Sequence, residues 1–368
     1  MSARPFLPRL RLFLQFAAVA LLLLVRAAVP DVIAQAAPSP DQDLRTEYRR
    51  PATPFPDTDP YSATKAKLGQ LLFFDPILSG SGKIACASCH NPSYSFTDGL
   101  RHGVGEHEMA THTPTLLNVA WAPILGWDGH FPSLEKVAFG PILNPEIMGG
   151  NEKEIIARLT AIPEYRAAFT AAFPDGVVSR TNIEDALATF ERTLVSGPAP
   201  FDRWVDGDES AISAAAKRGF ALFNGKAGCA ECHAGWAFTD EGFYDVGVGK
   251  GQDIGRGKLF ANSPKLQYAF KTPTLRNVAV RAPYMHDGSE ATLAAVIDLY
   301  NRGGVDRPSR ADPIKPLGLN AQEEADLIAF LKTLTSDQPI ALDIPILPRE
   351  ATAQLPEASS SDESRIAP

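Results

Sequence analysis

All four cysteines of the 368-residue chain lie in two copies of one short pattern, CASCH at 86–90 and CAECH at 229–233. Two cysteines separated by two residues and followed at once by histidine form the attachment signature of c-type haem. The thiols bond to the porphyrin, and the histidine becomes the proximal ligand of the iron. One copy alone would also fit a disulfide or half of a zinc site. Two copies that use every cysteine predict two covalent haems, held by Cys86, Cys89 and His90 and by Cys229, Cys232 and His233.

The duplication extends beyond these motifs, which indicates two similar domains in tandem. KLGQLLF (67–73) precedes the first motif and KRGFALF (217–223) the second, and each reads as a short amphipathic helix. TPTLLNVAWAP (113–123) corresponds to TPTLRNVAVRAP (272–283). WDGHFPSLEKV (127–137) then aligns with HDGSEATLAAV (286–296) without a gap. Each half is therefore expected to enclose one haem.

Apolar residues at helical spacing predict a mostly α protein, with helices over 151–173, 181–197 and 320–336. The connection between the halves is expected near 197–212. We predict an N-terminal domain over 60–200 and a C-terminal domain over 201–338, with an extension at 37–59. The tail at 339–368 is expected to form a strap and to be partly disordered.

The first 36 residues have the pattern of a secretory signal peptide. Three arginines precede an apolar run at 12–25, and Ala34-Gln35-Ala36 provides a small-residue cleavage site. An uncleaved membrane anchor is the alternative. The expected location is the periplasm. The net charge of −8 and the lack of a later basic run argue against a nucleic-acid partner.

In the order and spacing of these motifs, roughly 60–335 resembles the bacterial dihaem cytochrome c peroxidase family, including its MauG-like branch. The resemblance rests on the two CxxCH motifs, TPTLLN followed by WDG, TPTLRNVAVRAPYMHDG, and VIDLYNRGG. It implies two cytochrome c-like helical domains, each with one haem. The N-terminal haem would be the peroxidatic one, and the C-terminal haem would take in electrons or share oxidising equivalents.

The resemblance also points to the sixth ligand of each iron. In the C-terminal domain the family places Met or, in the MauG-like branch, Tyr in the helix after HDG, and here that helix offers Tyr300. A buried Tyr hydrogen-bonded near a propionate is the alternative, and Met285 is a rival ligand or a core residue. The repeat places Pro141 opposite Tyr300, and proline cannot bind iron. We therefore expect the sixth coordination site of the first haem iron to be open or weakly blocked.

A loop histidine blocks the open site in resting members of the family. The corresponding loop, 99–112, contains His102, His107 and His112, and His107 is nearest to the family position. For each of them, a solvent-exposed loop histidine is favoured over an iron ligand.

The resemblance places the acid–base group for peroxide cleavage at Glu135, eight residues after Trp127. The equivalent residue in the second half is Ala294, as divided roles would produce. The alternative is a glutamate on the surface of a helix. Where the family often has Gln, this chain has Leu125, which puts peroxide affinity and turnover in doubt.

Two further features follow from the resemblance. Trp121, Trp127 and Trp236 are candidates for an aromatic bridge between the haems, or are structural. Many members hold a calcium ion between the domains, which here would fall to His112 and the backbone carbonyls of Arg281 and Pro283. An imidazole is a poor ligand for this hard cation.

Three functions remain open at this point. The first is an exported peroxidase that reduces H2O2 to water at the N-terminal haem, with electrons from a small redox protein such as a cytochrome c or cupredoxin. The alternative is a MauG-like oxidase that uses H2O2-derived high-valent haems to oxidise Trp or Tyr side chains of a partner protein. The third is an electron carrier with both irons six-coordinate. Family members are often homodimers.

Overall fold

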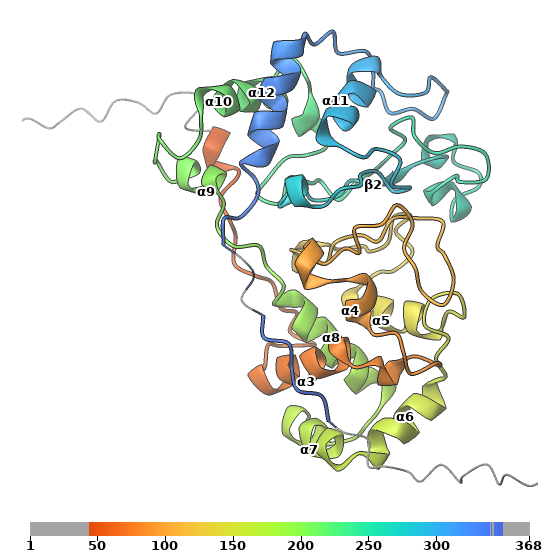
Figure 1. The fold of residues 1–368 in the computed structure, drawn as a ribbon. Coiled ribbons are helices and arrows are strands. Elements are labelled where there is room, and N and C mark those ends of the chain that lie inside the picture. Colours follow the sequence, from red (N-terminus) through yellow and green to blue (C-terminus); the bar gives the residue numbers. More distant parts are fainter. Residues whose placement is uncertain (1–43, 339, 341, 349–368) are drawn as a thin grey trace, which may run out of the picture. The chain divides into compact units, whose positions relative to one another are not determined.

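The computed structural model describes residues 44–338, 340 and 342–348 (Figure 1). The expected signal peptide at 1–36, the extension up to residue 43 and the end of the tail at 349–368 lie outside the described residues. The chain divides into Met1–Leu44 and Arg45–Pro368, and everything below concerns the second unit. Ten α-helices and two short strands are seen in the described part, which confirms the mostly α fold.

The helices and strands carry the labels of Figure 1. Before the second haem motif they are α3 (Ala63–Phe74), α4 (Cys86–Cys89), α5 (Leu134–Leu143), α6 (Glu152–Ala161), α7 (Pro163–Ala172), α8 (Arg180–Arg192), α9 (Pro200–Val205) and α10 (Ala214–Asn224). After it they are β1 (Phe243–Tyr244), β2 (Phe270–Lys271), α11 (Leu293–Arg302) and α12 (Ala321–Lys332). The strands pair antiparallel, with Phe243 opposite Lys271.

The same close helix crossing is built twice, by α3 on α8 and by α10 on α12 (Figure 1). A Cβ atom on Gly69 would lie 1.9 Å from the Ala186 carbonyl oxygen. A Cβ atom on Gly219 would lie 2.0 Å from the Asp326 carbonyl oxygen. Both glycines also face a buried aromatic residue, with Phe330 Cβ at 2.8 Å from the second position. The helices therefore approach so closely that a hydrogen atom is all that fits between them.

Gly69→Ala is expected to lower the free energy of unfolding by about 1–3 kcal/mol, because the added methyl group must force α3 away from α8. Lys67→Ala on the exposed face of α3 is the control and should stay within about 0.5 kcal/mol of the wild type. Thermal unfolding followed at the haem absorption band would measure both. Equal midpoints for the two variants would contradict a tight crossing.

Two expected elements differ from the structure. The helix expected over 151–173 is two helices, α6 and α7, which break at Ile162 because the following Pro163 disfavours helical geometry in the residue before it. The connection expected at 197–212 contains the short helix α9. Its Phe201 and Trp204 are buried against Phe220 of α10. This segment has the sequence of a linker, but the burial of its aromatic side chains stabilises a short helix.

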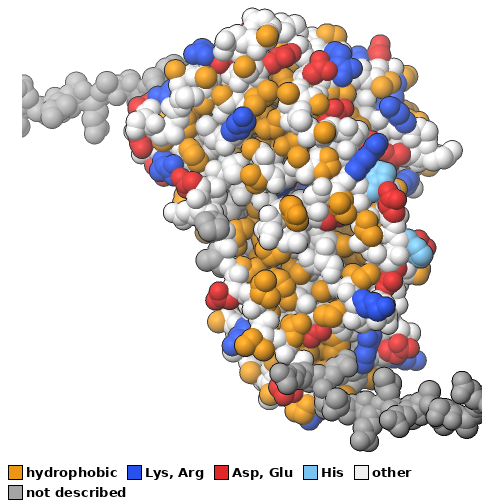
Figure 2. Space-filling model, viewed as in Figure 1, with side chains coloured by type: hydrophobic (Ala, Val, Ile, Leu, Met, Phe, Trp, Pro, Cys, Tyr) orange, Lys and Arg blue, Asp and Glu red, His pale blue; other side chains and the backbone are white. Residues whose placement is uncertain are grey.

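The part of the tail that is described returns to the first half. Ile340 and Leu342 pack against the core formed by α3, α7 and α8. The Gln70 side chain donates a hydrogen bond to the Asp343 carbonyl at 2.7 Å. On the face in Figure 2, Lys, Arg, Asp and Glu side chains are scattered without a patch of one sign, and apolar side chains lie between them. Among the described residues there is no helix with the length and hydropathy that a membrane span requires.

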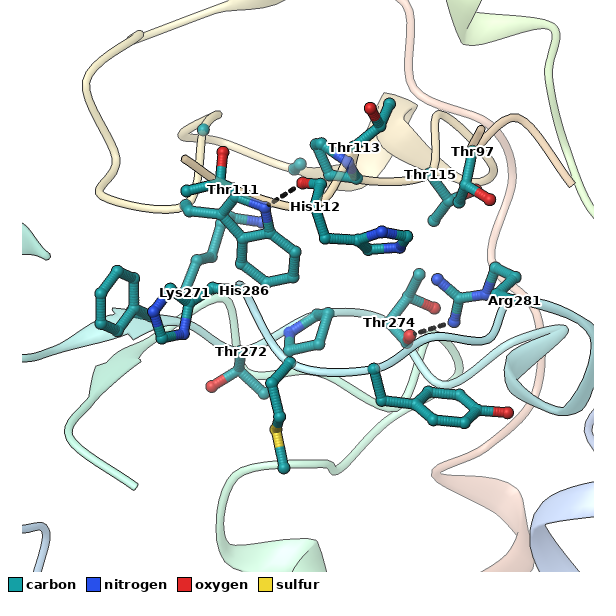
Figure 3. Close-up of a pocket in the computed structure, with 18 of the residues that line it drawn as sticks. Thr97, Thr111, His112, Thr113, Thr115, Lys271, Thr272, Thr274, Arg281 and His286 are labelled. Carbon is teal, nitrogen blue, oxygen red and sulfur yellow. Dashed lines mark hydrogen bonds between the residues drawn. The ribbon is translucent and has the colours of Figure 1, made fainter. Parts of the chain in front are cut away.

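Two matching hydrogen bonds join the halves. The His112 backbone N–H donates to the His286 carbonyl at 2.8 Å. The Lys271 N–H donates to the Trp127 carbonyl at the same distance. In the repeat, Lys271 corresponds to His112 and His286 to Trp127, so each half makes the same contact with the other. This pseudo-symmetric junction brings the two TPT segments face to face (Figure 3).

Candidate functional site

One cavity of about 640 Å³ contains both haem motifs. Its wall is mostly apolar, and the TPT segments of both halves face it (Figure 3). The predicted haem residues in this wall are Cys86, Cys89, His90, Cys229, Cys232 and His233. A large apolar cavity with a few polar groups is the usual setting for a cofactor.

Both motif histidines are held in the tautomer that a metal needs. His90 Nδ1 lies 3.1 Å from the Phe96 carbonyl oxygen, and His233 Nδ1 lies 2.8 Å from that of Phe238. A carbonyl oxygen can only accept, so each Nδ1 carries the proton and each Nε2 keeps its lone pair. Burial lowers the pKa of both imidazoles, which keeps them neutral. In each half, the Nε2 atom of the motif histidine can therefore bind iron.

The four motif cysteines are free thiols in the wall of the cavity. Burial raises the pKa of Cys86 and of Cys229 to about 12, so these thiols are protonated at neutral pH. Neutral thiols facing an apolar cavity suit covalent attachment of a porphyrin. Among the described residues, no three His, Cys, Asp or Glu side chains gather as a zinc site would require.

Replacing both cysteines of one motif by serine should reduce the covalent haem content from two to one. Cys86→Ser with Cys89→Ser is expected to leave the haem at 229–233, and the reciprocal double variant the haem at 86–90. Pyridine haemochromogen absorbance together with mass spectrometry of the denatured protein measures the number. Two covalent haems in either double variant would contradict the assignment.

Tyr300 on α11 lines the cavity. Its hydroxyl makes no hydrogen bond within the described part of the chain, unlike that of a buried structural tyrosine. Burial raises its pKa, and the neighbouring Cys229 and Cys232 raise it further. Met285 lines the same cavity, so both candidates for the sixth ligand are at hand. Pro141, inside α5, lines the wall as well.

Glu135 lies in the first turn of α5, beside the cavity. Leu134 and Val137 line the wall, whereas the Glu135 carboxylate is outside the lining and accepts a hydrogen bond from Arg192 Nη2 at 2.5 Å. Burial by itself raises the pKa of Glu135, but hydrogen bonds from Ser133, from its own backbone and from Arg192 outweigh it, and the net pKa is lowered. Glu135 is thus held as a carboxylate.

A second carboxyl group, Glu191 on α8, lines the cavity and did not stand out in the sequence. Burial raises the pKa of Glu191 to about 8, against the attraction of Arg192 and with a further increase from Glu135. Glu191 is therefore protonated at neutral pH. In the repeat its counterpart is the apolar Leu331, so the comparison that singles out Glu135 against Ala294 would also have found this residue.

The three histidines of the loop have different surroundings. His102 Nδ1 lies 2.8 Å from Glu108 Oε1, and His107 is exposed and outside the cavity lining. His112 is buried and lines the cavity, with Nδ1 at 2.7 Å from the Leu100 carbonyl oxygen. The structure therefore does not bring His107 to the cavity, although this histidine is the one nearest to the family position.

The three tryptophans separate into two groups. Trp121 and Trp236, from different halves, have ring centroids 4.6 Å apart at an angle of 51°. Trp127 lines the cavity instead and donates from Nε1 to the His112 carbonyl at 2.8 Å. The first pair is thus one aromatic contact between the halves, and Trp127 makes another with His286 at 6.5 Å between ring centroids.

At the expected calcium site neither His112 nor Arg281 offers a side-chain oxygen, so the backbone carbonyls of Arg281 and Pro283 stay a prediction there. His112 holds its Nδ1 proton toward Leu100, and the Arg281 side chain beside it is a buried cation. Nowhere in the described ranges do three or more His, Cys, Asp or Glu side chains gather around a point that could hold a metal ion. Calcium requires several oxygen ligands, with carboxylates prominent among them.

Comparisons with known proteins agree with this arrangement. Residues 63–210 match the family described as di-haem cytochrome c peroxidase, and residues 216–335 match cytochrome c. Methylamine utilization protein MauG of Methylorubrum extorquens is 48% identical over 83% of this chain and 88% of its own. Cytochrome c551 peroxidase of Nitrosomonas europaea is 36% identical over 81% of this chain and 87% of its own.

Among solved structures, a MauG-like protein associated with microbial copper homeostasis superposes with a TM-score of 0.75 at 31% identity. The match covers 83% of this chain and 97% of that one. Two motifs for covalent haem, two cytochrome c-like domains and these relatives lead to one conclusion: the chain belongs to the di-haem cytochrome c peroxidase family.

Proposed function

We propose that the protein is a MauG-like oxidase, which uses H2O2 to oxidise aromatic side chains of a partner protein. The observation that carries the proposal is Tyr300, which lines the cavity beside the second haem motif and has no hydrogen-bond partner among the described residues. A phenolate ligand stabilises ferric iron and lowers the reduction potential, whereas a Met ligand raises it. A low-potential second haem suits the sharing of oxidising equivalents better than the uptake of electrons from a small carrier.

The bound haems would supply the redox chemistry, and the chain supplies the proton transfers. Glu135 is ionised at neutral pH, since its pKa is lowered, and its place beside the cavity makes it our candidate to accept a proton from H2O2. Glu191 carries a proton at neutral pH and faces the cavity, so it can serve as the acid. Arg192 holds Glu135 and is itself fixed by Asp59 at 2.9 Å. Two carboxyl groups with pKa values displaced in opposite directions are a common arrangement for acid and base.

One H2O2 accepts two electrons and two protons and yields two water molecules. In the proposal the two electrons come from Trp or Tyr side chains of the partner protein, which are oxidised in one-electron steps. The Trp121–Trp236 pair lies at the junction of the halves and provides an aromatic route between them. We place the enzyme in the periplasm, since the N-terminal sequence has the pattern of a signal peptide.

A cytochrome c peroxidase is the second candidate, and a specific observation favours it. Met285 also lines the cavity, and a Met ligand would give the second haem a potential suited to electron uptake. A relative at 36% identity carries the name of a peroxidase. The donor would then be a small cytochrome c or cupredoxin.

The two candidates differ in their electron source. The diferric protein should be mixed with H2O2 and, in parallel, with a reduced small cytochrome c or with a Trp- and Tyr-containing protein encoded near its gene. The oxidase predicts loss of H2O2 with mass changes on aromatic residues of the second protein and little oxidation of the cytochrome. Rapid oxidation of the cytochrome, with an unmodified protein substrate, would contradict it.

A further inference from the structure

Three arginines of the described part are buried, namely Arg192, Arg276 and Arg281. Arg192 pairs with Asp59 and Glu135, and Arg276 pairs with Asp202 at 2.7 Å. Arg281 has no carboxylate partner among the described residues. Burying an unpaired charge is strongly unfavourable, so a buried arginine normally has an anionic partner. Arg281 is therefore an exception that needs an explanation.

The hydrogen bonds of the Arg281 guanidinium are also incomplete. Nη2 donates to the Thr274 carbonyl at 2.6 Å, and Nε is buried without a partner. Tyr284 is a titratable neighbour of Arg281, but its hydroxyl donates to the Val278 carbonyl at 3.0 Å, and burial raises its pKa. Tyr284 is thus neutral and is no counterion. A guanidinium stays protonated in proteins, so the Arg281 side chain is charged at neutral pH.

The guanidinium faces the haem cavity. Arg281 is one of the residues that line it, and Figure 3 shows its side chain and the His112 imidazole pointing into the same space from opposite walls. His112 adds no charge there, since its Nδ1 proton goes to Leu100 and burial lowers its pKa. Only the second half has an arginine at this position, because the corresponding residue of the first half is Ala122.

We propose that Arg281 binds a haem propionate at the junction of the two halves and provides there the positive charge that a calcium ion would otherwise supply. A haem carries two propionate carboxylates, and a guanidinium is a good donor for a carboxylate because its planar N–H groups match the two oxygens. The contact would neutralise the charge of Arg281 through the Nη groups, since Nε is buried in the protein. The inference requires both haems, which family membership supplies, and does not depend on which electron donor the enzyme uses.

Three variants of the holoprotein test this assignment. Arg281→Met removes the charge, Arg281→Lys keeps it with a different contact, and Lys265→Met removes an exposed positive charge paired with Asp312 at 3.2 Å. The haem content should be measured first. Resonance Raman spectra then report the propionate bending bands, and spectroelectrochemistry reports the reduction equilibrium of each haem.

We expect Arg281→Met to displace a propionate band and to disfavour reduction of one haem about tenfold, or about 59 mV for one electron, because a positive charge favours electron uptake. Arg281→Lys should displace the band with a smaller change in potential, and Lys265→Met should change neither. Unchanged bands in Arg281→Lys would overturn the proposal even if Arg281→Met fails to bind haem.

The metal content of the wild-type protein gives an independent test. After gel filtration in a chelator we expect less than stoichiometric calcium and unchanged haem spectra. One calcium ion per chain, with haem spectra that change when it is removed, would contradict the replacement of calcium by Arg281. Neither result bears on the electron source, so this inference and the proposed function can fail separately.

Discussion

Glu135→Gln is expected to slow the reaction of the holoprotein with H2O2 by about a hundredfold to ten-thousandfold, the usual contribution of a positioned acid–base group. Glutamine keeps the size of the side chain and can still accept a hydrogen bond from Arg192, but it cannot take a proton. Stopped-flow absorbance at the haem band, with H2O2 in excess, measures the bimolecular rate. The haem content and the reduction potentials should stay unchanged.

Two companion variants make this result specific. Lys136→Gln alters the next residue, whose side chain is exposed, and should react at the wild-type rate. Glu191→Gln should slow the step that consumes a proton but leave the initial binding of peroxide intact, since the group is protonated at neutral pH. If Glu135→Gln reacts like Lys136→Gln while Glu191→Gln is inactive, Glu191 is the acid–base group and Glu135 only positions Arg192.

Tyr300→Phe is expected to raise the reduction potential of the second haem by about 100 mV or more, within the roughly 0.8 V that axial ligands cover. The phenyl ring occupies the same place on α11 but cannot bind iron. The visible and Raman bands of a phenolate ligand should disappear, and the variant should lose its reaction with a partner protein. Spectroelectrochemistry and resonance Raman spectroscopy of the holoprotein provide the measurements.

Met285→Leu is the matched control, because Met285 lines the same cavity and is the rival ligand. In the proposed arrangement this variant keeps the wild-type potential and phenolate bands. A large fall in potential in Met285→Leu, together with an unchanged Tyr300→Phe, would identify Met285 as the ligand and favour the cytochrome c peroxidase.

Much of the architecture could be predicted because the repeat carries it. Two CxxCH motifs and two copies of a helix with glycine at the same place predict two haem domains, and the structure has both crossings at Gly69 and Gly219. Breaks within a helical segment were harder to predict from the sequence. Periodicity continues across Ile162 and Pro163, but the proline restricts the residue before it, and α6 and α7 separate there.

The site was harder to predict, because burial and charge pairing depend on the tertiary structure. The positions of Tyr300 and Glu135 follow from motifs, but the contact between Arg192 and Glu135 joins residues 57 positions apart. Arg281 entered the sequence argument through its backbone carbonyl alone. That its side chain is buried with no carboxylate partner in the described ranges is a property of the junction, which no local pattern reveals.

The central claim is tested most directly by rapid mixing of the fully oxidised holoprotein with one equivalent of H2O2, followed by absorbance and EPR spectroscopy. The account predicts that the diferric protein consumes the peroxide without prior reduction and that the ferric EPR signals of both haems decline together. A protein that is inert until one electron is added, and that then turns over with a reduced cytochrome, would contradict the MauG-like assignment.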